Sequence, residues 1–348
     1  MRAAVLHAPG PPDAFRIEEV EVPAIGPGDV LVQVAACGVS AKDVVERNGT
    51  YRREMRFPII LGAEIAGTIT AIGADVAGLA VGDRVCTKAF ASCGECRFCR
   101  SGRETTCLKR RHVRGGYAEF AAVAADACVA LLPGVSFEQG CTLGPGAGVA
   151  LNAVRDTARV QLGESVLVTG ASGGVGLAAL QLARLAGARV IALTRSEGKS
   201  AILRQWGADI VVVAPPREDF SKQVKAATDG DGVDVVIDTV GSEVFHGAFN
   251  SLALHGRYAL VGQLTGEETS INLARIFFKR AQLLGVGSVS RAQLADVVAL
   301  AGRGLLQSEI ARVLPLEDVA LAHELVEHGG AFGRVIINPG LGGGINGT

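Results

Sequence analysis

The amino-acid sequence predicts an α/β protein that combines a doubly wound, parallel six-stranded sheet with a second, β-rich domain. The first prediction rests on residues 165–195, SVLVTGASGGVGLAALQLARLAGARVIALTR, which have the pattern of a strand, a glycine turn, a helix and a strand. Further apolar runs alternate with helical stretches after this unit. The second prediction rests on residues 1–134, where short β-branched runs are separated by proline and glycine turns.

The glycine turn predicts a dinucleotide-binding site. A tight turn needs a residue that tolerates positive φ, a pyrophosphate needs close approach of the backbone, and the next helix must pack closely on the sheet. The free N–H groups at the start of that helix would face the pyrophosphate. The alternative is an ordinary glycine turn, but here the complete strand–helix–strand unit is present. The candidate cofactor-binding residues of the turn are Gly170, Ser172, Gly173, Gly174, Val175 and Gly176.

The end of the second strand indicates which dinucleotide binds. NAD-binding units usually place an acid there, and NADP-binding units place a cation nearby. This chain has Thr194 instead of an acid, then Arg195 and Ser196, with Lys199 further on. Arg195 and Lys199 could hold a 2′-phosphate, and Ser196 could donate to it. Alternatively, these are solvated residues at a helix start, with Ser196 as N-cap. Glu197 is the one charge that opposes an anion. We predict NADP(H) as cofactor.

The chain divides into three predicted segments. The nucleotide-binding domain is residues 135–287, with a helical region at 137–160 and strands at 165–169, 190–193, 210–213, 233–238, 257–262 and 281–286. Residues 1–134 form the β-rich domain, with strands at 2–7, 15–22, 29–36, 65–72 and 83–87 and a helix at 41–47. Residues 288–348 are expected to return to that domain, with helices at 293–302 and 316–327, strands at 310–314 and 334–337, and a flexible tail from residue 339.

Four cysteines have the spacing of a structural metal site. They occur in CGECRFCRSGRETTC, residues 93–107, as Cys-x2-Cys-x2-Cys-x7-Cys. Four thiolates suit tetrahedral zinc and leave no open position for water, so we predict one structural Zn2+ per chain. Free surface thiols are the alternative. The predicted ligands are Cys93, Cys96, Cys99 and Cys107.

Composition excludes several classes of function. The 348 residues carry a formal net charge of −1, which does not favour binding to nucleic acid or to an anionic membrane. No apolar run is long enough to span a bilayer. Four of the eight cysteines cluster with metal spacing, so we expect a cytoplasmic protein rather than a disulfide-bonded secreted one.

Several motifs, in order, resemble the medium-chain dehydrogenase/reductase superfamily. They are GTITAIGADVAGLAVGDRV, the four-cysteine lobe, GGYAEF, LVTGASGGVG, VDVVIDTVG and a closing FGRVIINP. The resemblance implies a GroES-like catalytic domain built from both ends of the chain and a Rossmann domain between them. It also implies an active site in the interdomain cleft. The last strand of the Rossmann sheet often pairs with its twin in the family, so a homodimer or homotetramer is expected.

Departures from the zinc alcohol dehydrogenase pattern indicate the branch. In that branch, zinc ligands stand at the positions that Ser40 and Ala63 occupy here, and the third ligand falls near Pro145. A hydroxyl, a methyl and a proline ring cannot make a zinc site, so no catalytic zinc is expected. Without a Lewis acid, alcohol oxidation loses its means of forming an alkoxide, whereas reduction of a conjugated C=C bond needs only donors for the enolate.

The chain is most similar to the quinone oxidoreductase and acryloyl-CoA reductase branch. The resemblance implies an NADPH-dependent reductase of activated C=C bonds, with an enoyl-CoA ester or another α,β-unsaturated carbonyl compound as substrate. Tyr51 matches a tyrosine proposed as proton donor in enoyl-thioester reductases, although it could instead pack or stack on the cofactor. Lys42 and Ser40 are further candidates for contact with the carbonyl oxygen, and Lys42 could equally be solvated.

Alternative interpretations of the arginine cluster and of the function remain open. Arg52, Arg53 and Arg56 could meet CoA phosphates or form a solvated face. The alternative functions are a quinone oxidoreductase, an alcohol dehydrogenase with an atypical site and a non-catalytic NADPH-binding protein.

Overall fold

A computed structural model describes residues 1–50, 55–263, 265–329 and 331–342. It contains two compact units: Met1–Pro145 together with the segment from Val289 onward, and Gly146–Ser288. We describe each unit by itself. In the described part of the chain, no helix is long and apolar enough to cross a membrane.

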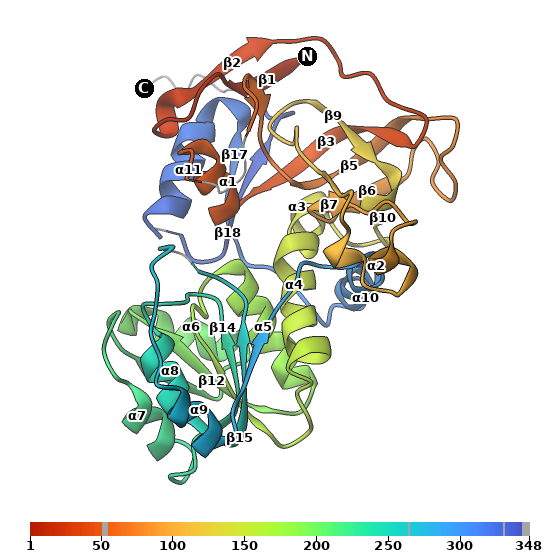
Figure 1. The fold of residues 1–348 in the computed structure, drawn as a ribbon. Helices are drawn as coiled ribbons and strands as arrows, with labels where there is room; N and C mark the ends of the chain where they lie inside the picture. Colours follow the sequence, from red (N-terminus) through yellow and green to blue (C-terminus); the bar gives the residue numbers. More distant parts are fainter. Residues whose placement is uncertain (51–54, 264, 330, 343–348) are drawn as a thin grey trace. The chain divides into compact units, whose positions relative to one another are not determined.

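The second unit is the doubly wound sheet that the sequence predicts (Figure 1). All six strands are parallel, in the order β13-β12-β11-β14-β15-β16. In chain order they are β11 (Ser165–Val168), β12 (Arg189–Thr194), β13 (Ile210–Val213), β14 (Val233–Asp238), β15 (Leu252–Leu260) and β16 (Gln282–Gly285). The inner strands β12, β11 and β14 carry fully buried β-branched and leucine side chains, as expected where helices cover both faces, whereas the outer strand β16 has no buried residue.

Helices connect these strands and cover the sheet. They are α4 (Val149–Leu151), α5 (Gly174–Leu185), α6 (Ser200–Gln205), α7 (Ser221–Ala226), α8 (Phe245–Ser251) and α9 (Leu273–Lys279). Right-handed crossovers put α5 and α6 on one face and α7 to α9 on the other. Strand β15 begins five residues before its predicted start, at Leu252. The sequence LALHGRYAL does not predict this extension, because the strand contains Gly256 and, next to it, His255 with a positive φ of 62°.

The first unit is built on a seven-stranded sheet of order β10-β6-β5-β3-β18-β17, with β9 paired to β3. Its strands are β3 (Asp29–Val39), β5 (Glu64–Ile72), β6 (Arg84–Thr87), β9 (Phe120–Ala124), β10 (Cys128–Ala130), β17 (Ile310–Pro315) and β18 (Arg334–Asn338). Smaller sheets contain β1 (Arg2–Leu6), β2 (Phe15–Glu19) and β4 (Ile59–Ile60), and β7 (Phe90–Ala91) with β8 (Arg111–His112). The helices are α1 (Ala41–Arg47), α2 (Arg97–Arg100), α3 (Phe137–Cys141), α10 (Arg291–Gly302) and α11 (Val319–Glu327).

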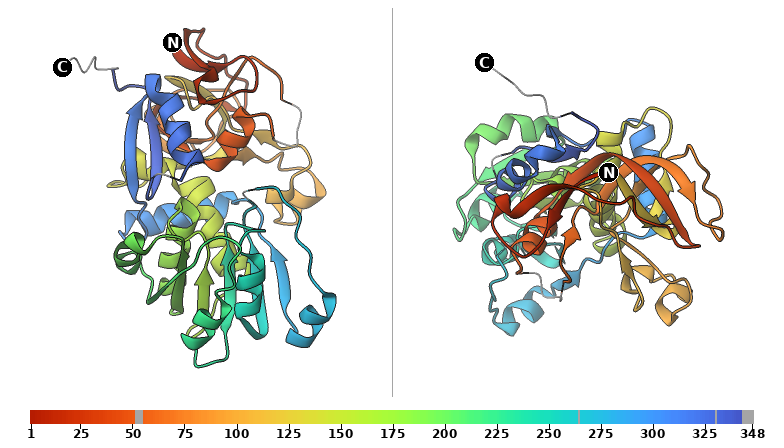
Figure 2. Two further views of the ribbon diagram at one scale, coloured as in Figure 1. Left: turned by 90° about the vertical axis from the view of Figure 1, so that its left-hand side faces the viewer. Right: turned by 90° about the horizontal axis from the view of Figure 1, so that it is seen from above.

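The C-terminal segment completes this first unit, as Figure 2 shows in blue beside the N-terminal strands. Strand β18 pairs antiparallel with β3, with Ile336 opposite Gly38, and β17 pairs parallel with β18. The start of the predicted tail is also held, because Arg2 donates to the Pro339 carbonyl over 3.0 Å.

A buried histidine in this unit makes its stability depend on pH. His323 on α11 is fully buried, lies 3.2 Å from the Tyr117 hydroxyl and packs on the Phe15 ring at 4.9 Å. Burial, helped by the charge of Arg47, lowers the pKa of His323 to about 3. In the unfolded chain the histidine pKa is about 6.5, so the unfolded state binds one more proton than the folded state between pH ~6.5 and pH ~3. The free energy of unfolding is therefore highest above pH ~6.5 and falls as the pH drops toward 3.

We therefore expect the His323→Phe variant to show a flatter acid limb of unfolding free energy. Between about pH 6 and pH 4 the wild type should lose roughly 1.4 kcal/mol more per pH unit than the variant. Urea unfolding at several pH values measures this difference, and Tyr117→Phe is the control that keeps the titrating ring. Parallel pH profiles for wild type and His323→Phe would contradict the assignment.

Candidate functional site

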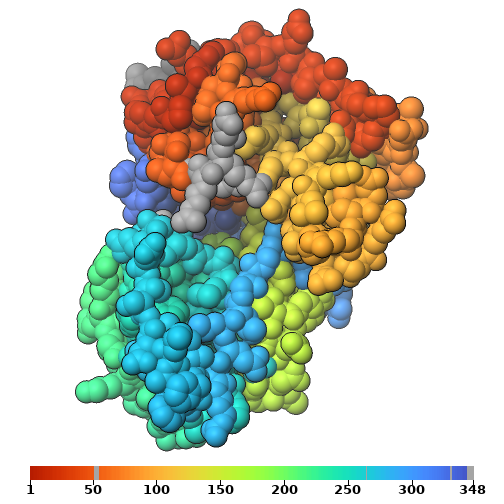
Figure 3. All heavy atoms as spheres, viewed as in Figure 1, coloured from red at the N-terminus to blue at the C-terminus, as the bar shows by residue number. Residues whose placement is uncertain are grey.

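The four predicted metal ligands converge in the first unit. Their sulfur atoms all lie within 4.8 Å of one another. A search of the described residues for three or more His, Cys, Asp or Glu side chains that could share a metal ion finds this group. Separations are 3.5 Å for Cys96–Cys99 and for Cys93–Cys107, and 3.9 Å for Cys93–Cys99. The lobe that carries them, coloured gold in Figure 3, projects from the surface of its unit.

These separations fit a tetrahedral zinc ion. Zinc–sulfur bonds of about 2.3 Å make a tetrahedron with edges of about 3.8 Å. Backbone amides already face the sulfurs, since Cys93 N donates to Cys107 Sγ over 3.3 Å and Cys96 N donates to Cys93 Sγ over 3.4 Å. Backbone donors around Cys96, chiefly the Cys99 amide, lower the pKa of this thiol to about 6, which favours the thiolate that a metal requires. Burial and the neighbouring thiols raise the pKa of Cys99 to about 12, so a metal ion would have to displace that proton.

The glycine turn of the second unit has the shape that a pyrophosphate requires. Gly170 has φ of 58°, and a Cβ there would lie 2.3 Å from Thr239 Oγ1. A Cβ on Gly176 would lie 2.3 Å from the Gly170 carbonyl oxygen, so α5 packs directly on the turn. Helix α5 starts after Gly173, which has no side chain to cap it, and its first N–H groups remain available for an anion.

One of the predicted selectivity residues, Lys199, lies beside this turn. Lys199 Nζ is 3.4 Å from Ser172 Oγ, so the end of β12 and the turn approach each other. Burial, followed by the like charge of Arg195, lowers the pKa of Lys199. Neither cation makes an ion pair within the described residues. Thr194 Oγ1 accepts a bond from Ser196 N over 3.3 Å, which orders the bend between them.

A buried carboxylate that the sequence analysis did not single out fixes the neighbouring strand end. Asp238, at the end of β14, accepts bonds from the Thr169 hydroxyl at 2.6 Å and the Tyr258 hydroxyl at 2.7 Å. The amides of Val240 and Gly241 also donate to it, at 3.0 and 3.1 Å. This network holds the glycine turn against the two central strands. The VDVVIDTVG motif was its only sequence signal.

In the first unit, Ser40 and Ala63 lie close together because β3 and β5 pair antiparallel, with Gly38 opposite Glu64. The Ser40 hydroxyl donates to Asp43 Oδ2 over 2.6 Å, and the Ser40 amide donates to the same oxygen over 2.9 Å. Ser40 is thus the N-cap of α1 in a capping box. Asp43 is buried, which raises the pKa of its carboxyl group. Ala63 is 3% exposed and has no polar side-chain atom.

Lys42 is held by a second buried acid. Its Nζ lies 2.9 Å from Glu46 Oε2, one helical turn further along α1, and Glu46 has no solvent-exposed side-chain surface. Arg114 Nη2 donates to the other oxygen, Oε1, over 3.1 Å. Lys42 and Arg114 each keep about a third of their side-chain surface exposed. Glu46 and Arg114 are additions to the predicted set, because no spacing rule connects residues so far apart in the chain.

Glu64, one residue after Ala63, is also paired. It is 2% exposed and accepts a hydrogen bond from Arg334 on β18. A Cβ on Gly38 would lie 2.6 Å from Glu64 Oε2, so the backbone approaches this acid closely. Tyr51, Arg52 and Arg53, the predicted proton donor and part of the arginine cluster, lie outside the described residues.

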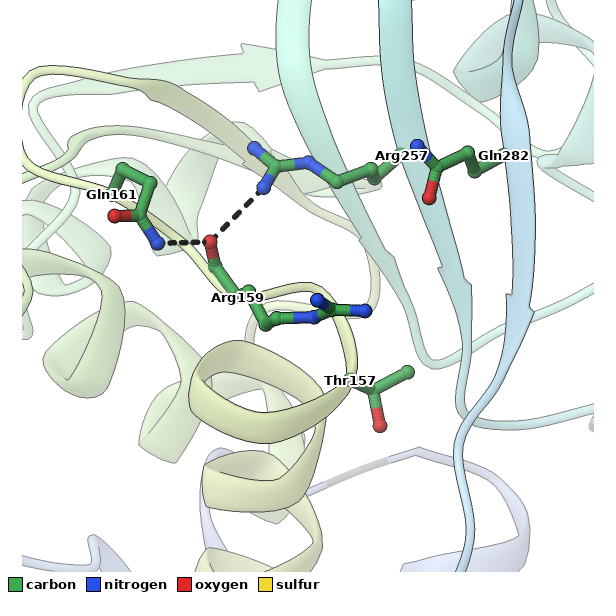
Figure 4. Close-up of a pocket in the computed structure, with 5 residues that line it drawn as sticks. All are labelled: Thr157, Arg159, Gln161, Arg257 and Gln282. Carbon is green, nitrogen blue, oxygen red and sulfur yellow. Dashed lines mark hydrogen bonds between the residues drawn. The ribbon is translucent and has the colours of Figure 1, made fainter.

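A separate pocket in the second unit has a polar lining and a volume of about 370 Å³ (Figure 4). Arg257 and Gln161 both donate to the Arg159 carbonyl, at 3.0 and 2.7 Å. Arg257 is also paired with Glu164. Because Arg159 precedes β11 and Gln282 begins β16, the pocket lies at the amino ends of the strands. Ligands of such sheets bind at the carboxyl ends, where the glycine turn lies.

The parallel sheet with its glycine turn and the β-rich unit form the architecture of a two-domain oxidoreductase, and comparison with known proteins gives its family. Residues 26–133 match the alcohol dehydrogenase GroES-like domain, and residues 174–303 match the zinc-binding dehydrogenase family. The chain belongs to the medium-chain dehydrogenase/reductase superfamily. It is an oxidoreductase of that family with a GroES-like domain and a Rossmann-like parallel sheet, as the sequence predicts.

Its relatives are named for several different activities. An acryloyl-coenzyme A reductase from Sulfurisphaera tokodaii is 33% identical over 97% of this chain and 100% of its own. A quinone oxidoreductase from Lama guanicoe is 34% identical over 97% of both chains. Among solved structures, a crystal structure of AibC superimposes with a TM-score of 0.93 at 37% identity, covering 98% of this chain and 96% of the other.

Proposed function

We propose that this protein is an NADPH-dependent reductase of activated C=C bonds that takes an enoyl thioester or a related α,β-unsaturated carbonyl compound. The observation that carries the proposal is the pair Ser40 and Ala63. The Ser40 hydroxyl is engaged by Asp43 and Ala63 offers no ligand atom, so neither supports a catalytic zinc. The names of the acryloyl-coenzyme A reductases among its relatives support the same substrate class.

Bound NADPH would supply a hydride to the β-carbon, and a proton would complete the α-carbon. The phosphates of the cofactor would be held by the glycine turn and α5, and its 2′-phosphate by Arg195, Lys199 and Ser172. Lys42 would stabilise the negative charge that develops on the carbonyl oxygen, with its ammonium oriented by Glu46. Ser40 would orient α1 at this place, and Tyr51 would donate the proton.

Two further features belong to the proposal. Cys93, Cys96, Cys99 and Cys107 would hold one structural zinc ion. The outer strand β16, next to exposed Leu273, Phe277 and Phe278 on α9, supports a homodimer or homotetramer.

Quinone reduction is the second candidate. A quinone also accepts a hydride at a conjugated carbonyl system, and the similarity to a quinone oxidoreductase extends over 97% of the chain. This reaction would make no use of a CoA-binding surface.

A substrate panel separates these functions. NADPH oxidation is followed by absorbance with acryloyl-CoA, crotonyl-CoA, a simple enone and a quinone. We expect kcat/KM for the CoA esters to exceed that for the enone by about 10-fold or more, since remote binding energy of the CoA moiety is used in the transition state. Turnover of the quinone alone would favour the second candidate. Turnover of a simple alcohol with NADP+ would overturn the proposal.

A further inference from the structure

The zinc lobe is attached to the rest of its unit through a buried lysine. Lys88 follows β6, and its side chain is 1% exposed. Its ammonium group lies 2.8 Å from Glu104 Oε1 and 3.1 Å from Asp126 Oδ2. An ammonium group at this depth is tolerated only when it is paired, and two carboxylates satisfy it here.

Each carboxylate also contacts one end of the lobe. Asp126 Oδ2 accepts bonds from the amide and the hydroxyl of Ser92, at 2.7 and 2.8 Å, and Ser92 precedes the first ligand, Cys93. Glu104 lies three residues before the last ligand, Cys107, and begins a 3-10 turn (Glu104–Thr106). Glu104 Oε1 additionally accepts the Arg291 amide of α10 over 2.6 Å. One ammonium group therefore fixes both the entry and the return of the lobe.

We propose that Lys88 is a positioning residue for the metal centre, which holds the four thiols within reach of one zinc ion before the ion arrives. The inference rests on the proposed structural zinc. Lys88 does not touch the ion and acts through Glu104 and Asp126. Outer partners of this kind commonly change metal affinity by about 10- to 100-fold, because they set the orientation of the ligands. The same contacts connect the lobe to α10.

The test measures zinc affinity by competition with a chromophoric chelator, using the full-length protein. Lys88→Met is expected to lower the affinity by about 10- to 100-fold. Lys109→Met is the matched control, because Lys109 also pairs with a lobe acid, Glu95 at 2.5 Å, but is 68% exposed. Its affinity should stay within about 2-fold of wild type, since exposed ion pairs contribute little.

A second readout separates positioning from general damage. In the zinc-loaded Lys88→Met protein, the Arg291 amide should exchange its hydrogen faster than in wild type, while amides of β3 keep their protection. If Lys88→Met does not fold, Asp126→Asn replaces it and should lower zinc affinity by about 3- to 10-fold.

The outcomes distinguish the two proposals. A wild-type protein that binds no zinc would refute the zinc site itself. A wild-type protein that binds one zinc ion, with equal affinity in the Lys88→Met and Lys109→Met variants, would refute the role of Lys88 and leave the zinc site standing.

Discussion

Replacing Arg195 and Lys199 together by alanine is expected to weaken NADPH binding on the order of 100-fold while NADH binding changes little. Each hydrogen bond between a cation and a phosphate contributes about 1.5–3 kcal/mol, and two lost bonds of the weaker kind account for this factor. The expectation follows from the geometry after β12, where Lys199 lies 3.4 Å from Ser172 and Arg195 is close enough to lower the pKa of Lys199. Neither cation has an ion-pair partner among the described residues.

Fluorescence titration with both cofactors measures the effect. Arg204→Ala is a matched control, since Arg204 is an exposed cation in the last turn of α6. Wild-type affinities for NADPH and NADH that are equal, or an equal loss of both in the double variant, would show that these cations do not select the 2′-phosphate.

Replacing Cys107 by serine is expected to reduce the zinc content from one ion per chain to none and to unfold the lobe locally. Cys107 is the most buried of the four cysteines, at 1% exposure, and a three-thiolate remnant binds zinc far more weakly. Structural zinc contributes about 10 kcal/mol or more to the folding of small metal domains. In this larger protein only part of that free energy contributes to the stability of the whole unit, because the lobe can unfold locally. We therefore expect Tm to fall by roughly 5–15 °C.

Metal analysis and hydrogen exchange over the lobe test this result. Cys128→Ala is the control, because Cys128 is a buried thiol of β10 outside the group of four. It should lose some packing energy but keep its zinc. A Cys107→Ser protein that retains one zinc ion and the exchange protection of the lobe would contradict the prediction.

Local patterns allowed the architecture to be predicted. The run from Ser165 to Arg195 contains its strand, turn and helix signals in one short segment, and the structure has β11, α5 and β12 there. The cysteine spacing likewise encodes a cluster whose members are neighbours in the chain. In both cases the physical requirement lies within a short segment, so one sequence suffices to recognise it.

The groups that support these sites could not be predicted in the same way. The role of Lys88 depends on its ion pairs with Glu104 and Asp126. The role of Lys42 depends on its ion pair with the buried Glu46, which Arg114 also contacts. In the sequence each of these residues is an ordinary charged residue of a kind that usually lies on the surface. Only the folded chain shows which of them are desolvated and therefore must be paired.

The late pairing of β18 with β3 also has a consequence for biosynthesis. Cys37–Val39 of β3 leave the ribosome early, but their partners at Val335–Ile337 follow roughly 300 residues later, which is about 15–60 s at usual elongation rates. During that interval the Cys37–Val39 end of β3 lacks its β18 partner, and Glu64 lacks the counter-charge of Arg334. The second unit, one continuous segment from Gly146 to Ser288, emerges complete within it. The second unit therefore has all of its strands before the sheet of the first unit can be completed.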